Sequence, residues 1–154
     1  MPIQRVTHVG ICVSDMERSL RFYRDLLGFR YLSKLHVAGE PTDTLLSLRD
    51  VDLHAAYLER DGLRIELLQF PSPPRRDPQP ERLMNDLGLT HLSFRVSELK
   101  DLLGRLRAEG VRVIEKSWIE IPPFETAAVM IVDPDGQRIE LVHAPGDPAA
   151  PPQV

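Results

Sequence analysis

The five residues Arg64–Leu68 read Arg-Ile-Glu-Leu-Leu, and the phrase returns almost unchanged at Arg138–Val142 as Arg-Ile-Glu-Leu-Val. A second pair of matching phrases lies upstream of these, where Thr7-His8-Val9 corresponds to Thr90-His91-Leu92. Repetition of this kind is typical of a chain built from two copies of one structural unit. Because the repeated positions include histidine and glutamate, which bind metal ions, the repeat predicts a metal site.

Both halves of the chain follow the same order of elements, which predicts an α+β fold made of two βαβββ modules. We place the first module at residues 1–70, a proline-rich linker at 71–88, the second module at 89–144 and a flexible tail at 145–154. Five of the ten residues from 71 to 80 are prolines, which disfavour both a helix and an interior strand.

The pattern of apolar residues, caps and turns predicts the elements of each module. The first module should hold a helix at 16–27, capped by Ser14-Asp15 and ended by Gly28, with strands at 4–13, 29–37, 44–48 merging into 52–58, and 63–70. The second should hold a helix capped by Ser97 and running to Glu109, with strands at 89–96, 113–118, 126–132 and 137–142. Asp61-Gly62 and Asp135-Gly136 are hairpin signals because both residue types tolerate positive φ.

Composition narrows the class of partner. The chain has 154 residues, of which 42% are hydrophobic, and a formal net charge of −4 with no concentrated basic stretch. These values indicate a folded protein that binds a small molecule rather than nucleic acid or a membrane. Neither a membrane-spanning stretch nor a secretory signal is apparent, so we expect a cytoplasmic protein. Cys12 is the only cysteine, which excludes a thiolate-rich zinc site and leaves nitrogen and oxygen as metal ligands.

The alternation of side chains along a strand predicts how the ligands are oriented. His8, Gly10 and Cys12 should face one way, as should His91, Ser93 and Arg95, while Glu66 and Glu140 point opposite their apolar neighbours. The four ligands could then line one concave surface. Two imidazoles and two carboxylates suit a borderline divalent ion in five- or six-coordinate geometry, with positions left open for water or substrate.

Four stretches resemble the vicinal oxygen chelate superfamily, also called the glyoxalase/bleomycin resistance/dioxygenase family. They are residues 7–15, Phe22–Phe29, Gly88–Phe94, and Asp133-Pro134-Asp135-Gly136 followed by Ile139-Glu140-Leu141. The resemblance implies paired βαβββ modules that form a curved mixed-sheet cup, with one divalent metal ion per site (Ni, Co, Zn, Mn or Fe). It places His8, Glu66, His91 and Glu140 on the metal ligands. It also implies a homodimer, with each site formed either within one chain or across two.

The full set of two histidines and two glutamates is similar to that of glyoxalase I, and methylmalonyl-CoA epimerases have a similar site with glutamine at the second position. The resemblance therefore implies a metal-dependent lyase or isomerase that moves a proton alpha to a carbonyl through a metal-stabilised enediolate or enolate. Glu140 is the first candidate for the base, and Glu66 is the second. Two alternatives stay open: a non-haem iron dioxygenase, and a metal-free protein that binds an antibiotic or another small molecule.

Other residues are weaker candidates for a functional role. Asp52 and His54 share a strand face and are candidates to line the cup, whereas we expect His36 and His143 to face solvent. Cys12 is either a cup residue or, more commonly for an isolated cysteine, a small buried hydrophobe. The remaining candidates, which could form an apolar pocket wall or simply pack in the core, are Trp118, Phe124 and Met130.

Overall fold

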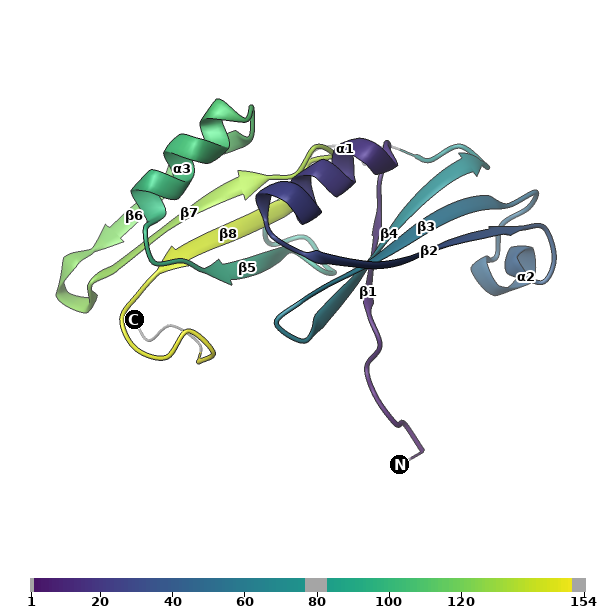
Figure 1. Ribbon diagram of the computed structural model, residues 1–154, viewed down its shortest axis with the longest axis horizontal. Helices are drawn as coiled ribbons and strands as arrows, with labels where there is room; N and C mark the ends of the chain where they lie inside the picture. The colour runs from purple at the N-terminus through teal and green to yellow at the C-terminus, as the bar shows by residue number, and fades with distance from the viewer. Residues whose placement is uncertain (1, 77–82, 151–154) are drawn as a thin grey trace. The chain divides into compact units, whose positions relative to one another are not determined.

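A computed structural model describes residues 2–76 and 83–150 of the chain. The chain divides near residue 79 into two compact units, and each unit is described here by itself. Each unit contains one four-stranded mixed sheet and a principal helical segment (Figure 1). The predicted α+β class is therefore confirmed.

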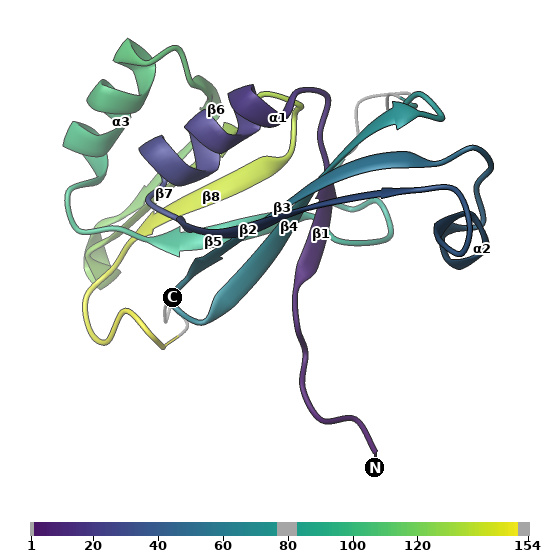
Figure 2. The same cartoon turned by 45° about the vertical axis from the view of Figure 1, so that its right-hand side comes forward.

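The first unit has the strand order β1-β4-β3-β2, in which β1 runs parallel to β4 and the other neighbours are antiparallel. Figure 2 shows this sheet from a second direction. Its elements are β1 (Val9–Cys12), α1 (Met16–Leu20), the π-helix η1 (Arg21–Leu26), β2 (Arg30–Ala38), α2 (Thr42–Leu46), β3 (Asp52–Arg60) and β4 (Leu63–Ser72).

The first helical segment begins and ends where the sequence predicts. The Asp15 carboxylate accepts a hydrogen bond from the Arg18 backbone nitrogen at 2.8 Å, which satisfies one of the donors left over at a helix start. The segment changes from α to π winding at Arg21, and Gly28 ends it with a φ of 73°. It contacts β4, and its buried residues Phe22 and Tyr23 join Leu58, Ile65 and Leu67 of the sheet in the core.

Two predictions for the first unit need correction. Residues 44–48 are not a strand: Thr42–Leu46 form helix α2, because the Asp43 carboxylate accepts hydrogen bonds from the backbone nitrogens of Asp50 and Val51 and folds the segment back on itself. Strand β1 also begins only at Val9, five residues later than predicted. The Asp61-Gly62 hairpin is confirmed, since both residues have positive φ between β3 and β4.

The second unit repeats this topology with the strand order β5-β8-β7-β6, in which β5 runs parallel to β8. Helix α3 buries Leu99, Leu103 and Leu106, and contacts β6 and β8. The elements are β5 (His91–Arg95), α3 (Leu99–Ala108), β6 (Arg112–Ile121), the short 3₁₀ helix η2 (Pro122–Phe124), β7 (Thr126–Val132) and β8 (Arg138–His143).

Two local features of the second unit differ from the sequence prediction. The residue at the start of α3 is Glu98 rather than Ser97, and its side chain makes no capping hydrogen bond. The Asp135-Gly136 pair lies in a five-residue connection rather than a two-residue hairpin, because the buried Asp133 carboxylate accepts from the backbone nitrogens of Asp135 and Gln137. Within the predicted tail 145–154, the carbonyls of Pro145 and Ala150 accept hydrogen bonds from Arg95.

The remaining boundaries depart modestly from the predicted ones. Strand β4 extends to Ser72 and therefore enters the predicted linker 71–88, of which residues 77–82 lie outside the described part of the chain. Residues 151–154 of the predicted tail also lie outside it. Among the described residues, no helix is long and apolar enough to cross a membrane.

Candidate metal centre

The first unit brings His8 and Glu66 together on its sheet. His8 lies immediately before β1, and the parallel register of β1 with β4 places Gly10 opposite Glu66. The His8 Nε2 atom lies 3.1 Å from Glu66 Oε2, and Glu66 is the more buried of the two, with 12% of its side chain exposed against 34% for His8. Two potential metal ligands predicted from the repeat are therefore in contact.

The second unit brings His91 and Glu140 together in the equivalent way. His91 begins β5, and the parallel register of β5 with β8 places Ser93 opposite Glu140. The His91 Nε2 atom lies 3.7 Å from Glu140 Oε2, with 29% and 28% of the two side chains exposed. Each unit thus presents one imidazole and one carboxylate on the same face of its sheet.

The threonine before each histidine fixes the orientation of the imidazole. Thr7 Oγ1 lies 3.0 Å from His8 Nδ1, and Thr90 Oγ1 lies 2.9 Å from His91 Nδ1. In the tautomer in which Nδ1–H donates to the hydroxyl, Nε2 carries the lone pair and points at the glutamate. A hydrogen bond on the nitrogen that does not bind metal is the usual arrangement around a metal-binding histidine.

The two halves differ in what holds the carboxylate. Tyr57 lies opposite Glu66 across β3 and β4, and its hydroxyl donates a hydrogen bond to the Glu66 carboxylate, which together with burial raises the pKa of Tyr57 to about 12. The Tyr57 ring also meets the His8 ring edge to face, with centroids 5.5 Å apart. In the second unit, Ser93 Oγ donates a hydrogen bond to Glu140 Oε2 at 2.7 Å.

These partners have no counterparts in the other half. The register places Gly10 where Ser93 lies in the second unit, and Met130 where Tyr57 lies in the first. Glu66 is therefore held by an aromatic hydroxyl next to its histidine, and Glu140 by a small aliphatic hydroxyl. The two glutamates are not chemically equivalent even though the sequence repeats them.

The donor set fits a borderline divalent cation. His8, Glu66, His91 and Glu140 offer two imidazoles and two carboxylates, and the threonine contacts at Nδ1 are compatible with the tautomer that leaves Nε2 available to a metal ion in each histidine. Two carboxylates also supply the negative charge that a dication needs. Each unit therefore offers one imidazole and one carboxylate to a cation.

Other predicted residues lie elsewhere. Cys12 is opposite Leu68, on the Glu66 face of the sheet, and it is exposed rather than a buried hydrophobe. His54 and Asp52 were predicted as candidates to line the cup. This prediction is wrong, because they do not share the sheet face that carries Glu66. His54 lies opposite Gln69, three positions from the Tyr57–Glu66 pair, so alternation along β3 turns His54 to the opposite face.

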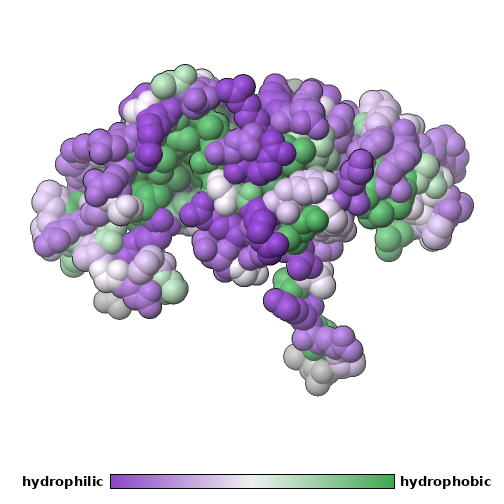
Figure 3. Space-filling view, viewed as in Figure 1, coloured by the Kyte–Doolittle hydropathy of each residue, from purple (hydrophilic) through white to green (hydrophobic). Residues whose placement is uncertain are grey.

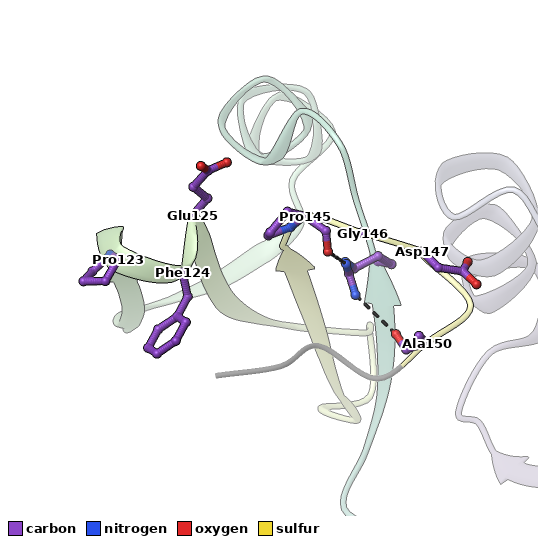
Figure 4. A pocket seen from close by; sticks show the side chains of 8 residues that line it. Pro123, Phe124, Glu125, Pro145, Gly146, Asp147 and Ala150 are labelled. Carbon is purple, nitrogen blue, oxygen red and sulfur yellow. Dashed lines mark hydrogen bonds between the residues drawn. The ribbon is translucent and has the colours of Figure 1, made fainter.

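The three candidate pocket residues of the second unit do not lie together. Met130 lies opposite Glu140 and so shares its face, whereas Trp118 lines a hollow at the start of α3 with Lys100, whose Nζ is 5.8 Å from the centre of the Trp118 ring. Phe124 lines a different pocket of about 490 Å³ (Figure 4). Arg95 also lines this pocket, and it donates hydrogen bonds to the carbonyls of Pro145 and Ala150.

Sequence reasoning did not identify Tyr57 or the two threonine hydroxyls as parts of the site. The Thr-His pairs were visible in the repeat, and a hydroxyl one residue before a histidine could have been read as a partner for its Nδ1. Tyr57 carries no such signal, because its position depends on the cross-strand register set by the hairpin at Asp61-Gly62. His143, expected to face solvent, is half-buried with its Nδ1 3.2 Å from the Val96 carbonyl oxygen.

Comparison with known proteins identifies the family and supports the fold. The family model described as "Glyoxalase/Bleomycin resistance protein/Dioxygenase superfamily" matches residues 5–141. The uncharacterized protein YaeR of Escherichia coli is 31% identical over 90% of this chain and 95% of its own length. The lactoylglutathione lyase of Neisseria meningitidis is 26% identical over 90% of each protein. A crystal structure of a glyoxalase family protein from Bacillus cereus superposes with a TM-score of 0.81 at 21% identity, covering 95% of this chain and 97% of that one.

Proposed function

Because the chain belongs to the glyoxalase/bleomycin resistance protein/dioxygenase superfamily, we propose that it is a divalent-metal-dependent lyase or isomerase that moves a proton alpha to a substrate carbonyl. The four proposed metal ligands are His8, Glu66, His91 and Glu140. The protein would act as a homodimer on a small molecule. Each site would be assembled from one His8–Glu66 pair and one His91–Glu140 pair.

A single observation carries this proposal. In both units the histidine directs Nε2 toward a glutamate while its Nδ1 meets the hydroxyl of the preceding threonine. A surface histidine that only packs or faces solvent does not require both contacts. Their occurrence at two repeated positions supports a shared role for the two histidines. The arrangement supports a pair of half-sites built to hold a cation.

The contacts of the two glutamates favour Glu140 as the base. Glu140 is the more exposed, its oxygen lies farther from its histidine nitrogen (3.7 Å against 3.1 Å), and its partner is the small hydroxyl of Ser93. Glu66 is held more tightly, between His8 and Tyr57. A base has to leave its resting partners in order to reach a substrate proton, so the less constrained carboxylate is the better candidate.

The proposed reaction divides the work between the ion and the chain. A bound divalent ion would polarise the substrate carbonyl and stabilise the negative charge that develops on its oxygen. Glu140 would take the α-proton and return it at its new position, and Ser93 would orient the Glu140 carboxylate by its hydrogen bond. Glu66 would remain a ligand. The Tyr57 hydroxyl, which stays protonated at neutral pH, would donate a hydrogen bond to the Glu66 carboxylate.

The experiment begins with tag-free protein that has been stripped of metal and titrated with Zn²⁺, Ni²⁺, Co²⁺ and Mn²⁺ by calorimetry. The loaded protein is then assayed without oxygen on a methylglyoxal hemithioacetal and on an α-branched acyl-CoA thioester, in D₂O so that NMR detects proton exchange. Glu140→Gln should retain metal binding while proton transfer falls by about 10²–10⁴-fold, the usual contribution of a general base.

Glu66→Gln is the matched control, because it changes the other glutamate in the same way. We expect Glu66→Gln to keep most of the proton transfer, since amide oxygen can still bind the ion. Equal losses in both variants would contradict the assignment of Glu140 as the base. A wild-type protein that binds none of these ions would overturn the enzyme proposal, and activity that strictly needs iron(II) and consumes oxygen would replace it with a dioxygenase.

A further inference from the structure

We propose that His36, Asp52 and His54 form a second divalent-cation site, separate from the four-ligand centre. His36 lies on strand β2, and Asp52 and His54 lie on the neighbouring strand β3. Their side-chain ligand atoms all lie within 4.8 Å of one another. This site is independent of the proposed function, which does not use any of the three residues.

Two imidazole nitrogens converge on one carboxylate oxygen in this cluster. His36 Nε2 lies 2.7 Å from Asp52 Oδ1, and His54 Nε2 lies 3.8 Å from the same oxygen. Ligand atoms of a tetrahedral zinc ion are about 3.3 Å apart, which follows from metal–ligand distances near 2.0–2.1 Å. The two observed distances lie on either side of that value, so the three atoms are close enough to surround one ion once the stacked rings of His36 and His54 tilt out of parallel and direct both nitrogen lone pairs at it.

The backbone holds the two histidines in register. His36 and His54 are directly opposite each other in the antiparallel pair of β2 and β3, and their rings stack with centroids 4.3 Å apart and planes 6° from parallel. The start of β3 is fixed as well, because Val51 donates its N–H to the Asp43 carboxylate and accepts one from Gly39 through its carbonyl. Ligands on hydrogen-bonded strands lose little freedom when an ion binds.

The cluster faces away from the candidate metal centre. His54 lies opposite Gln69, and the Gln69 side chain accepts a hydrogen bond from the Met16 backbone nitrogen at the start of α1. This face therefore carries the helix, and Glu66 lies on the other face. An ion at the cluster could not replace the ion proposed for His8 and Glu66, because the sheet itself separates them.

The donor set determines which ions would bind. Two imidazoles and one carboxylate suit Zn²⁺, Ni²⁺, Co²⁺ or Cu²⁺ rather than Mg²⁺ or Ca²⁺, which prefer oxygen ligands. The three side chains are 58%, 40% and 49% exposed, in the order His36, Asp52 and His54, so the remaining coordination positions would be open to water or to a small ligand. A bound ion would tie the edge strand β2 to β3.

The test removes the four-ligand centre first. The variant His8→Ala/His91→Ala is stripped of metal and titrated with Zn²⁺ and with Co²⁺ by calorimetry, while the visible absorption of Co²⁺ reports nitrogen ligation independently. We expect one equivalent of metal per chain to bind. Adding His54→Ala or Asp52→Asn should abolish that equivalent. Adding His143→Ala, which removes the one histidine outside both proposed sites, should leave it intact.

The outcomes separate this site from the proposed function. No binding to the double variant would overturn the second site, even if wild-type protein binds one equivalent at the four-ligand centre. Binding that survives both His54→Ala and Asp52→Asn would overturn it too, because the ion would then lie elsewhere. Since all three residues are on the surface, circular dichroism of the apo variants should match wild-type, and His54→Gln provides a second removal of the ligand that preserves side-chain size.

Discussion

At the scale of single residues, the hydroxyl of a threonine contacts Nδ1 of the histidine that follows it. Thr90 Oγ1 lies 2.9 Å from His91 Nδ1, and replacement by valine keeps the shape while removing the partner. Loss of such an outer contact typically weakens metal binding by about 10–100-fold, so we expect Thr90→Val to show that loss in a competition titration against a chelator. Thr44→Val, which removes a surface hydroxyl bonded to Glu40, should bind as wild-type does. Unchanged affinity in Thr90→Val would refute the role of the hydroxyl.

At the scale of single residues, Glu59 is expected to make the stability of the fold depend on pH. The Arg30 guanidinium, with help from the Gly62 backbone N–H, holds the pKa of the Glu59 carboxyl below its usual value of 4.5. A carboxyl with a lowered folded-state pKa stabilises the fold above the unfolded-state pKa, and this stabilisation is lost as the pH falls through the folded-state pKa. Glu59→Gln should therefore lower Tm slightly at about pH 7 and leave it unchanged at about pH 2.5. A Tm difference that is equal at both pH values would contradict this.

At the scale of elements, helix α3 contains a glycine that destabilises it relative to alanine. Gly104 lies in the exposed part of α3, and a Cβ built there would meet no atom within 4 Å. Gly104→Ala should raise the free energy of unfolding by roughly 0.5–1 kcal/mol, because alanine loses less backbone entropy in a helix. Gly110→Ala is the control: its site is equally open, but its φ of 80° should cost roughly 1–2 kcal/mol. Urea denaturation of both variants checks the pair, and the same sign of effect in both would be inconsistent with it.

The same scale shows how far the sequence predicts the fold. Helices and hairpins with a local signal, such as the Asp15 cap and the Asp61-Gly62 turn, lie where they were expected. Helix α2 was missed because its geometry depends on Asp43 bonding to backbone nitrogens seven and eight residues downstream. Strand β3 begins at Asp52, where the second part of that strand was predicted, but the sequence does not give the pairing of His36 with His54 or the face on which they lie.

The candidate site shows the same division between local and long-range information. The His8–Glu66 and His91–Glu140 contacts follow from the repeat, because matching phrases occupy matching strands. Tyr57 does not follow from it, since its counterpart in the second unit is Met130 and the sequence gives no register between strands. A duplicated sequence therefore predicts what the two halves share, and the structure is needed for what distinguishes them.

At the scale of the whole molecule, the described surface includes exposed apolar side chains. Polar side chains cover much of the face seen in Figure 3, but apolar patches interrupt them. Large apolar side chains with high exposure occur in both units, and they include Val6, Leu45, Leu87, Leu89 and Ile119. Exposed apolar surface of this kind is consistent with the predicted homodimer, which sedimentation of the apo and metal-loaded protein would test directly.

Each unit offers only one histidine and one glutamate, too few ligands for a stable closed site, and our proposal is that both kinds of half contribute to one ion. We therefore expect His8→Ala alone and His91→Ala alone each to lose the whole equivalent bound at the four-ligand centre, measured in an Asp52→Asn/His54→Ala background that removes the second cluster. Retention of half an equivalent in either variant would mean that the halves bind separately. Mixing and refolding the two variants then locates the site: if the halves come from different chains, the mixed dimer regains one intact site, and if they come from one chain, nothing is regained.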